Sequence, residues 1–388
     1  MSFTRYQQYK DSGVEWWGDM PDGWSLFPAK RSFSRKKELN VGMKCENRLS
    51  LTLGGVVPRA LDDLDGLQAS EFETYQIFSA DDLVFKLIDL QNIKTSRVGL
   101  VPKIGIMSPA YIRVEPDKTK VTPKFAYWFF TNLYNRCIFN ELGGGVRQTI
   151  SSEELLLLPF PALPLPEQAQ IAAFLDRETA KIDDLVAEQR RLMDLLKEKR
   201  QAVISHAVTR GLNPDAPMKP SGIEWLGDVP EHWDTRTIAK ASTKITNGFV
   251  GPTRDILVEA GTPYIQATHI KNGRVNFDEG YFVRPDWSAA HSKSILCEGD
   301  VLIVQTGAGT GDVGLVSAHE VGYNCHALII VAPDRKLLHG TYLSAVLQST
   351  YGQEKLTSIE TGAMHPHLNC GEVKFVEVPL PPLAEQSD

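Results

Sequence analysis

The sequence lacks several features that would assign the chain to a common protein class. Its cysteines are five in number and no two of them form a CxxC pair: Cys45, Cys137, Cys297, Cys325 and Cys370. The odd count and wide spacing exclude a disulfide framework and a zinc ribbon, so we expect reduced and mostly buried thiols. No apolar run approaches the roughly 18 residues of a membrane helix, and the N-terminus carries no signal peptide, which predicts a cytoplasmic protein without a membrane partner.

Catalytic and cofactor-binding motifs are also scarce. The dipeptide GK is absent, which excludes a GK[ST] phosphate loop. GTGDVG at 309–314 fits GxGxxG, but the residues after it predict a strand where a dinucleotide fold needs a helix. Asp334 with 372–374 resembles the PD-ExK nuclease pattern, although Glu154, Leu155 and Leu156 stand at the matching place in the first half. We therefore expect no catalytic residue, no cofactor and no metal site.

Positive charge is in short supply as well. The net charge is −7, and Lys plus Arg against Asp plus Glu number 20 to 19 over residues 1–160, 8 to 8 over 161–214 and 13 to 21 over 215–388. A protein that holds DNA by itself usually shows a basic surplus, because phosphate contacts supply most of the non-specific affinity. A nucleic-acid function must therefore account for this deficit of positive charge.

What the sequence does contain is a long internal repeat. SGVEWWGDMPDGW at 12–24 recurs as SGIEWLGDVPEHW at 221–233, with Trp16, Trp24, Trp225 and Trp233 in matching places. Further segments match in the same order, with offsets between 209 and 218: 80–86 with 298–305, 97–101 with 312–316, 108–116 with 325–333, 123–130 with 340–347, and 159–168 with 377–386. Two copies of about 150 residues indicate a tandem duplication of one domain.

Each copy has the pattern of an α+β domain. DLVF, YIRV, DVLIV and ALIIV are short, rich in β-branched residues and bounded by Gly, Pro or Asp, which predicts strands. The helical spacing of apolar residues over 123–139 predicts a helix packed on the sheet. The Trp-rich phrase combines large rings with turn residues, which is typical of a chain that packs against the edge of a domain.

A long helix is predicted between the copies. Residues 166–211 run from a proline to a glycine without either residue in between, and would form a rod of roughly 65 Å. Aliphatic residues recur along one seam at heptad spacing: Leu175, Ile182, Leu185, Leu192, Leu196 and Val203. Such a seam predicts a coiled-coil partner helix.

This order of segments resembles the specificity subunit of type I DNA restriction-modification systems. The most specific parts are LPLPEQAQIAAFLDRETAKIDDLVAEQRRLMDLLKEKRQAVISHAVTRGL and KPSGIEWLGDVPEHW. The resemblance implies target-recognition domain 1 at 1–160, a central helical region at 161–214, domain 2 at 215–380 and the start of a distal helical region at 381–388. A full distal helix, usual in that family, is missing after Ser387, so we expect a truncated, split or partial chain.

The resemblance also implies the partners. Each recognition domain would read one half of a bipartite site on double-stranded DNA, and the helix would set the spacer and dock methyltransferase subunits, with a restriction subunit completing the complex. The chain itself would be a non-catalytic subunit. Self-association through the helix, or a separate chain that supplies the distal helix, is the expected way to cover the seam.

Loop residues with side chains suited to base edges are the candidate DNA contacts. Arg and Lys match guanine, and Asn and Gln match adenine. The candidates are Arg59, Lys94, Arg97, Arg147 and Gln148 in the first copy, and Thr268, His269, Lys271, Asn272, Arg274, Gln305, Thr310, His365 and His367 in the second. Two alternatives to DNA recognition stay open at this point: a non-productive scaffold or decoy, and a nuclease.

Overall fold

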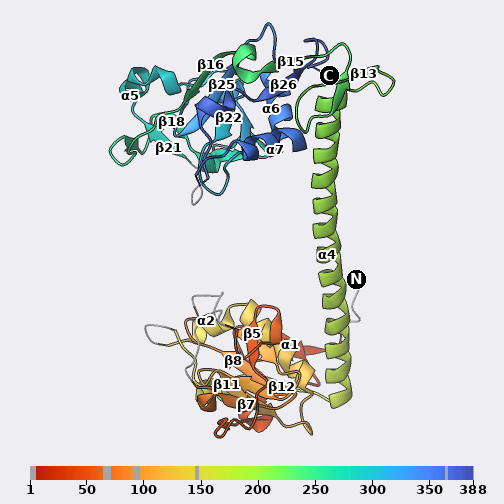
Figure 1. Ribbon diagram of the computed structural model, residues 1–388. Coiled ribbons are helices and arrows are strands. Elements are labelled where there is room, and N and C mark those ends of the chain that lie inside the picture. Colours follow the sequence, from red (N-terminus) through yellow and green to blue (C-terminus); the bar gives the residue numbers. More distant parts are fainter. Residues whose placement is uncertain are drawn as a thin grey trace. The chain divides into compact units, whose positions relative to one another are not determined.

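The computed structural model describes residues 6–63, 71–90, 97–144, 148–278, 280–362 and 366–387. The chain divides into two compact units, which we call unit 1 (Met1–Ala187) and unit 2 (Glu188–Asp388). Each unit contains both sheet and helix, so the predicted duplication of an α+β domain is confirmed. The helix α4 (Leu165–Arg210) begins in unit 1 and ends in unit 2 as one unbroken element (Figure 1).

Unit 1 is built on a four-stranded sheet in the order β4-β11-β8-β9. Its elements are β1 (Tyr9–Asp11), β2 (Asp19–Pro21), β3 (Ser25–Pro28), β4 (Phe33–Arg35), β5 (Leu49–Thr52), β6 (Gly55–Pro58), β7 (Gln76–Phe78), β8 (Leu83–Lys86), β9 (Arg97–Leu100), β10 (Gly105–Met107), β11 (Ile112–Pro116), α1 (Pro123–Asn135), α2 (Ile138–Leu142), α3 (Ser152–Leu157) and β12 (Pro159–Ala162). The predicted strands DLVF and YIRV are β8 and β11, and the predicted helix is α1.

The core of unit 1 lies between α1 and the sheet. Phe85 of β8 and Phe130 of α1 are fully buried and meet edge to face, with ring centroids 5.1 Å apart. Phe160 of β12 packs on the same ring cluster, at 4.9 Å from Phe33 of β4. Burying aromatic rings of this size supplies most of the stabilisation of such a core, because each removes a large apolar area from water.

Unit 2 is built on a six-stranded sheet in the order β16-β25-β22-β23-β20-β19. Its elements are β13 (Met218–Pro220), β14 (Asp228–Pro230), β15 (Asp234–Thr237), β16 (Ser242–Asn247), β17 (Leu257–Val258), β18 (Thr262–Ile265), β19 (Ile270–Lys271), β20 (Gly273–Val275), β21 (Tyr281–Val283), α5 (Pro285–Ala290), β22 (Val301–Val304), β23 (Val313–Leu315), β24 (Asn324–Cys325), β25 (Leu328–Pro333), α6 (Gly340–Gln348), α7 (Thr350–Ser358), α8 (Cys370–Val373) and β26 (Glu377–Leu380). Four of these strands correspond to those of unit 1, since β16, β25, β22 and β23 match β4, β11, β8 and β9 in order.

A glutamine fastens the sheet region of each unit to the segment that follows its last strand. In unit 1 the buried Gln168 accepts a hydrogen bond from the Thr122 amide (2.8 Å) and donates to the carbonyl oxygens of Lys120 (2.9 Å) and Leu163 (3.0 Å). In unit 2 Gln386 does the same with the His339 amide (2.8 Å) and the carbonyls of Leu337 (2.9 Å) and Pro381 (2.8 Å). We refer to this arrangement as the glutamine clamp.

The repeated Trp-rich phrase contacts the same place. Trp24 donates its indole N–H to Glu167 (3.0 Å), and Trp233 donates to Glu385 (2.9 Å). Each partner glutamate directly precedes the glutamine of the clamp. The last tryptophan of the phrase therefore holds the beginning of each unit against its end, in keeping with the packing role that its composition indicates.

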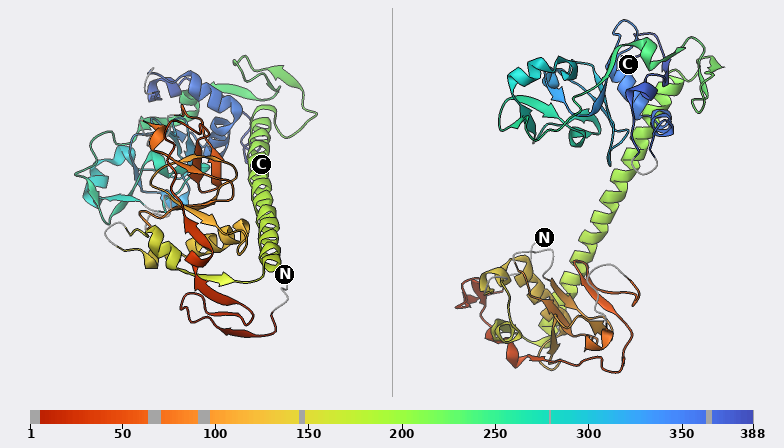
Figure 2. Two further views of the ribbon diagram at one scale, coloured as in Figure 1. Left: turned by 90° about the horizontal axis from the view of Figure 1, so that it is seen from below. Right: turned by 60° about the vertical axis from the view of Figure 1, so that its left-hand side comes forward.

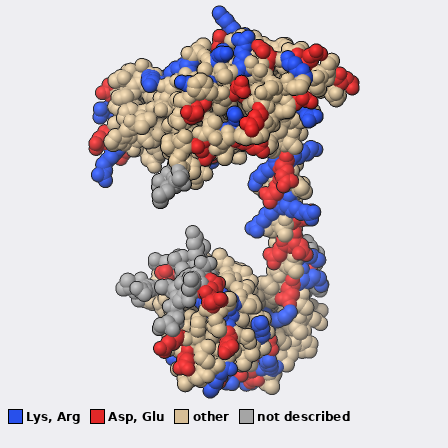
Figure 3. Space-filling view, in the orientation of Figure 1, with Lys and Arg blue, Asp and Glu red and all other residues tan. Residues whose placement is uncertain are grey.

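The helix α4 runs through all views as a single rod (Figures 1 and 2). Of the predicted seam, Leu175 is half-buried, whereas the other five side chains are about half exposed or more: Ile182 (58%), Leu185 (60%), Leu192 (47%), Leu196 (55%) and Val203 (58%). Acidic and basic side chains are interspersed around the exposed part of the helix (Figure 3). The described helices include none that is long and apolar enough to cross a membrane.

One expectation about the cysteines is wrong. All five are free thiols, as predicted, but only Cys325 is buried; Cys137 and Cys297 are exposed, and Cys45 and Cys370 are intermediate. The exposed pair lies outside the regular strands, at the turns after α1 and before β22. Sequence spacing alone does not report on which side of a turn a thiol points.

Candidate nucleic-acid interface

One edge of the unit 2 sheet gathers polar side chains from segments that are far apart in the sequence. Strand β22 ends at Val304, and the loop 305–312 returns the chain to β23. Parallel pairing of β20 with β23 sets Gly273 opposite Gly314, so the turn at Asn272 lies beside the end of this loop. Antiparallel pairing sets Val304 opposite Leu328, and Ile329 opposite Asn247, which brings the end of β16 to the same place. We call this the loop edge of unit 2.

A second segment closes over the loop edge. The Leu368 amide donates to the Gln305 carbonyl (3.0 Å), and a β-bridge joins Thr306 to His367. The His367 ring lies 3.1 Å from the Thr361 hydroxyl. The geometry thus unites Gln305, His367 and Asn272, three of the predicted DNA contacts.

The turn between β19 and β20 is tight and exposed. Asn272 and Gly273 have φ values of 54° and 80°, the pair of left-handed conformations that a two-residue hairpin turn requires. The positive φ of Gly273 favours glycine, and a Cβ there would also lie 2.3 Å from the Gln348 side-chain oxygen and displace that side chain. The turn presents three exposed predicted residues, Lys271, Asn272 and Arg274, at the end of a rigid hairpin.

The glycine-rich loop 305–312 is held from inside the unit. The Thr310 hydroxyl donates to the Gly307 carbonyl (2.8 Å), and the Gln353 amide donates to the Gly311 carbonyl (3.1 Å). Asp312 is the last residue of this loop. Burial raises the pKa of its carboxyl. GTGDVG runs directly into a strand, since its last two residues begin β23, where a dinucleotide fold would have its phosphate-binding helix.

Two predicted residues of unit 2 have different surroundings. Thr268 is exposed in the short helical turn Ala267–His269. His269 is buried, and its Nδ1 accepts a hydrogen bond from the Gln266 amide (2.9 Å). Its ring therefore supports the turn from inside, and we leave His269 out of the candidate interface. His365 lies outside the described residues.

Unit 1 has a matching loop edge. Strand β8 ends at Lys86, which pairs with Arg97 at the start of β9. The closing segment recurs too, because the Ile150 amide donates to the Leu87 carbonyl (3.2 Å) and the Leu90 amide to the Gln148 carbonyl (3.2 Å). Gln148 is thus placed at this edge, in a left-handed conformation with φ 39°. For Arg97, the structure describes the backbone position only.

Of the remaining predicted residues of unit 1, Arg59 alone is described. Arg59 follows β6 and its Nε forms an ion pair with Asp63 (2.7 Å). Lys94 and Arg147 lie outside the described residues.

The structure adds residues that the sequence patterns did not single out. Val114 of β11 pairs with Arg35, and the repeat-equivalent Val331 of β25 pairs with Ile245. Lys37 of unit 1 therefore occupies the position that Asn247 holds in unit 2. Lys37 is exposed and makes no ion pair within the described part of the chain, and the Asn247 side chain accepts a hydrogen bond from the Cys370 thiol (2.8 Å). Strand register is the signal that finds this pair, and it is invisible in a single sequence.

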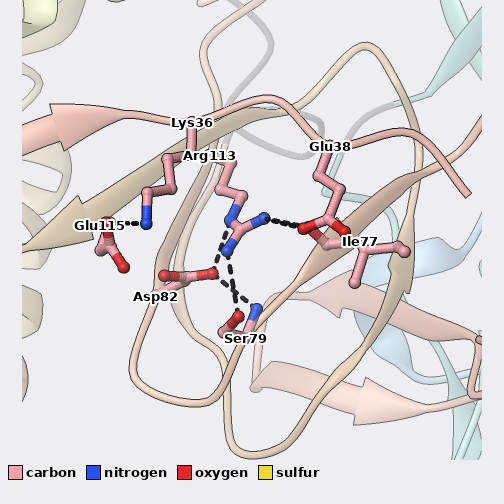
Figure 4. Close-up of polar contacts among 7 residues, drawn as sticks. All are labelled: Lys36, Glu38, Ile77, Ser79, Asp82, Arg113 and Glu115. Carbon is pink, nitrogen blue, oxygen red and sulfur yellow. Dashed lines mark hydrogen bonds and ion pairs between the residues drawn. The ribbon is translucent and has the colours of Figure 1, made fainter.

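A buried ion pair stiffens the unit 1 sheet beside this edge (Figure 4). Arg113 of β11 donates to Asp82 (2.7 Å), to the Ile77 carbonyl (2.5 Å) and to the Ser79 hydroxyl (3.1 Å). Asp82 also accepts from the Ser79 amide (2.6 Å). Burial raises the pKa of the Asp82 carboxyl, and the Ser79 amide and Arg113 oppose that rise. The cluster is fully engaged with itself, so it supports the sheet and is not offered to a ligand.

Charges of both signs are mixed over the face drawn in Figure 3. Near the unit 1 edge, Arg35 pairs with Glu153 (2.8 Å) and Lys36 with Glu115 (2.6 Å). Within the described residues, no group of three or more His, Cys, Asp or Glu side chains has the arrangement of a metal site. The loop edges therefore present hydrogen-bonding side chains among charges of both signs. This arrangement suits contacts with base edges better than strong phosphate binding.

Two homologous α+β units, each with a loop edge of differing side chains, define a duplicated two-domain protein. A family model, the type I restriction modification DNA specificity domain, matches residues 63–191 and 225–388. The chain belongs to this family.

Two individual relatives are type I restriction enzyme specificity subunits as well. The specificity subunit of the type I restriction enzyme EcoBI from Escherichia coli is 26% identical over 294 residues, which cover 73% of this chain and 60% of that subunit. The putative type I restriction enzyme MjaX specificity subunit from Methanocaldococcus jannaschii is 19% identical over 400 residues, covering 100% of this chain and 89% of the relative. The chain thus spans less than two thirds of the EcoBI subunit.

Solved structures share the fold. The HsdS subunit from Thermoanaerobacter tengcongensis has a TM-score of 0.53 at 15% identity, over 95% of this chain and 87% of that chain. A chain from a structural study of complex assembly and conformational transition of the type I R-M system has a TM-score of 0.64 at 17% identity, over 95% and 88%.

Proposed function

We propose that the chain is the DNA-sequence recognition subunit of a type I restriction-modification complex, and that each loop edge reads one half of a bipartite site. The observation that carries this proposal is the matched pair of loop edges. Repeat-equivalent backbone positions at the two edges carry different side chains, with Lys37, Leu87 and Thr149 in unit 1 where unit 2 has Asn247, Gln305 and His367. Two homologous units with different side chains at equivalent positions are what two half-sites of different sequence require.

The chain's own residues supply recognition and no reaction step. No described group of His, Cys, Asp and Glu side chains has the arrangement of a metal site, and the mixed charge leaves most phosphate binding to partners. Methyltransferase subunits that dock on α4 would provide both the phosphate contacts and the chemistry, and a restriction subunit would provide cleavage. The helix would fix the number of base pairs between the half-sites.

Methylome sequencing tests the proposal. Cells that express the chain together with type I methyltransferase subunits should show methylated adenine in one bipartite motif. The double substitution Gln305→Ala and His367→Ala should relax one half of that motif and leave the other half intact. The matched control is Arg59→Ala, which alters a predicted contact that lies away from the loop edge. Absence of new methylation, or a double variant with an unchanged motif, would contradict the proposal.

A further inference from the structure

The last residue of β16, Asn247, has its side chain held by a thiol. Asn247 is half-buried, and its Oδ1 accepts a hydrogen bond from the Cys370 thiol, with the sulfur 2.8 Å away. Burial raises the pKa of the Cys370 thiol, so the group stays protonated and can donate at neutral pH. Sulfur is a weak acceptor, which disfavours the opposite orientation with Nδ2 against the thiol. The contact therefore fixes which end of the Asn247 amide faces Cys370.

The thiol is carried by a firmly anchored segment. Cys370 is the first residue of α8, and the side chain of Asn369 caps this helix by accepting a hydrogen bond from the Glu372 amide (3.0 Å). Just before it, the fully buried Leu368 donates its amide to the Gln305 carbonyl (3.0 Å), which ties the segment to the end of β22. A donor on such a support can hold a neighbouring amide in one orientation.

The other end of the Asn247 amide is available to a ligand. Its Nδ2 makes no hydrogen bond with the part of the chain that the structure describes, and it is not a buried atom. Because Oδ1 is turned toward the thiol, Nδ2 faces away from it. An asparagine that rotates freely offers either an acceptor or a donor, and so can accommodate either kind of base edge. Asn247 in this orientation offers donors.

Unit 1 also presents donors at the equivalent position, through a different residue. Lys37 stands where unit 2 has Asn247, and an ammonium group donates hydrogen bonds but cannot accept them. The repeat places Ser152 at the position of Cys370, and Lys37 and Ser152 line one cavity. A lysine has no acceptor for this hydroxyl, which donates to Glu153 instead (3.1 Å). The two units thus share a donor at this position although the side chains differ.

We propose that Asn247 donates to an acceptor on a base edge of the half-site that unit 2 reads, and that Cys370 is a positioning residue that keeps the amide in this orientation. This inference rests on the proposed function and adds the chemistry of one contact. Guanine N7 and O6, adenine N7 and thymine O4 are acceptors in the major groove, whereas adenine N6 and cytosine N4 are donors. A fixed donor separates these two classes at the point of contact.

Methylome sequencing of cells that express each variant with the type I methyltransferase subunits tests this assignment. Cys370→Ala releases the amide, so one position of the unit 2 half-site should lose about tenfold in discrimination while every other position is kept. Cys370→Ser keeps a donor on the same carbon and should preserve the motif. Asn247→Asp replaces the donor with an acceptor and should change the preferred base pair at that position. Cys297→Ala, which alters an exposed cysteine before the start of β22, is the matched control and should leave the motif unchanged.

Three results would overturn the inference. They are an unchanged motif with Cys370→Ala, an equal loss of discrimination with Cys370→Ser and Cys370→Ala, and effects of Asn247→Asp and Cys370→Ala at different positions. The double substitution of Gln305 and His367 identifies the half-site that unit 2 reads. If that double variant relaxes one half-site and the Cys370 variants change nothing, only this inference fails. If no bipartite motif is methylated with the unaltered chain, the proposed function itself fails.

Discussion

Asp82 in unit 1 and Asp300 in unit 2 hold the same turn before the central strand of each sheet, but their surroundings differ. Each carboxylate accepts a hydrogen bond from the backbone amide three residues earlier, Ser79 (2.6 Å) and Cys297 (2.9 Å). Asp82 also meets the buried Arg113, whereas the repeat places Ile330 at the arginine position in unit 2. Burial raises the pKa of both carboxyls.

The comparison separates what the fold needs from what one unit has added. The turn needs the carboxylate, since both copies keep it. The guanidinium is an addition that ties β11 to β7 and β8 in unit 1, while a fully buried isoleucine does the corresponding packing in unit 2. Buried ion pairs are often no more stabilising than apolar residues of similar volume, although removing one partner alone is strongly destabilising.

The largest expected effect tests the difference between Asp82 and Asp300. Asp82→Asn leaves the buried Arg113 charge with only the exposed Glu38 carboxylate, 3.8 Å away, as a counter-ion, and should lower local stability by about 3 kcal/mol. Asp300→Asn keeps an acceptor oxygen and loses only the charge that strengthens the turn hydrogen bond, so it should cost about 1 kcal/mol. Hydrogen exchange of the β8 and β22 peptides measures each unit separately, which a two-unit chain requires. The double variant Asp82→Asn, Arg113→Ile should recover most of the loss; equal effects of the two single changes would refute the account.

The next effect concerns the tryptophans of the repeated phrase. Trp233 is 2% exposed and packs with Val208 of α4 in the unit 2 core, so Trp233→Ala should cost about 3–5 kcal/mol in unit 2. Trp24 is only half-buried, so Trp24→Ala should cost roughly half as much in unit 1. Limited proteolysis of the two units reads out the difference. A folded Trp233→Ala variant with an altered DNA motif would show instead that the phrase reads bases.

The glutamine clamps of the two units should contribute equally to stability, unlike the aspartates and tryptophans compared above. Gln168→Ala and Gln386→Ala each leave one buried amide and two carbonyls without partners, and each should destabilise its unit by about 1–3 kcal/mol. Hydrogen exchange at the Thr122 and His339 amides should accelerate in the respective variant. A large effect in one unit only would mean that the clamps are not equivalent.

The smallest effect is on salt dependence. Lys37 carries a charge where Asn247 has none, so Lys37→Ala should reduce the slope of log affinity against log salt by about 1 for DNA bound by the assembled complex. Asn247→Ala should leave the slope unchanged. Fluorescence anisotropy at several salt concentrations measures both, and identical slopes for the two variants would place Lys37 away from phosphate.

Much of the architecture could be predicted from the sequence, because duplication makes each copy a check on the other. The strands β8 and β22, the helix α1 and the long α4 follow from apolar spacing and from Pro and Gly boundaries. The loop edges were only partly predictable. Gln305 and His367 stand next to matched segments, but Lys37 and Asn247 lie where the two copies diverge, and only strand pairing brings them into correspondence.

Two other features were hidden for physical reasons. An arginine inside YIRV has the pattern of a solvent-facing strand residue, so its burial against Asp82 depends on a tertiary contact with a segment 31 residues away. His269 has the composition of a loop contact, yet its ring satisfies a backbone amide of its own turn. Both cases are side chains that turn inward, which composition does not reveal.

The glutamine clamp has a practical consequence for exchanging recognition units between proteins. Gln168 bonds mainly to backbone atoms, at residues 120, 122 and 163, and its side-chain oxygen has one longer contact with the Thr122 hydroxyl (3.5 Å), so it recognises chiefly the path of the main chain. A graft that carries residues 120–122 and 163–168 together transfers the whole set of contacts intact. Cutting between them would separate the amide from its partners, which makes the position after Gln168 the natural seam for a chimera.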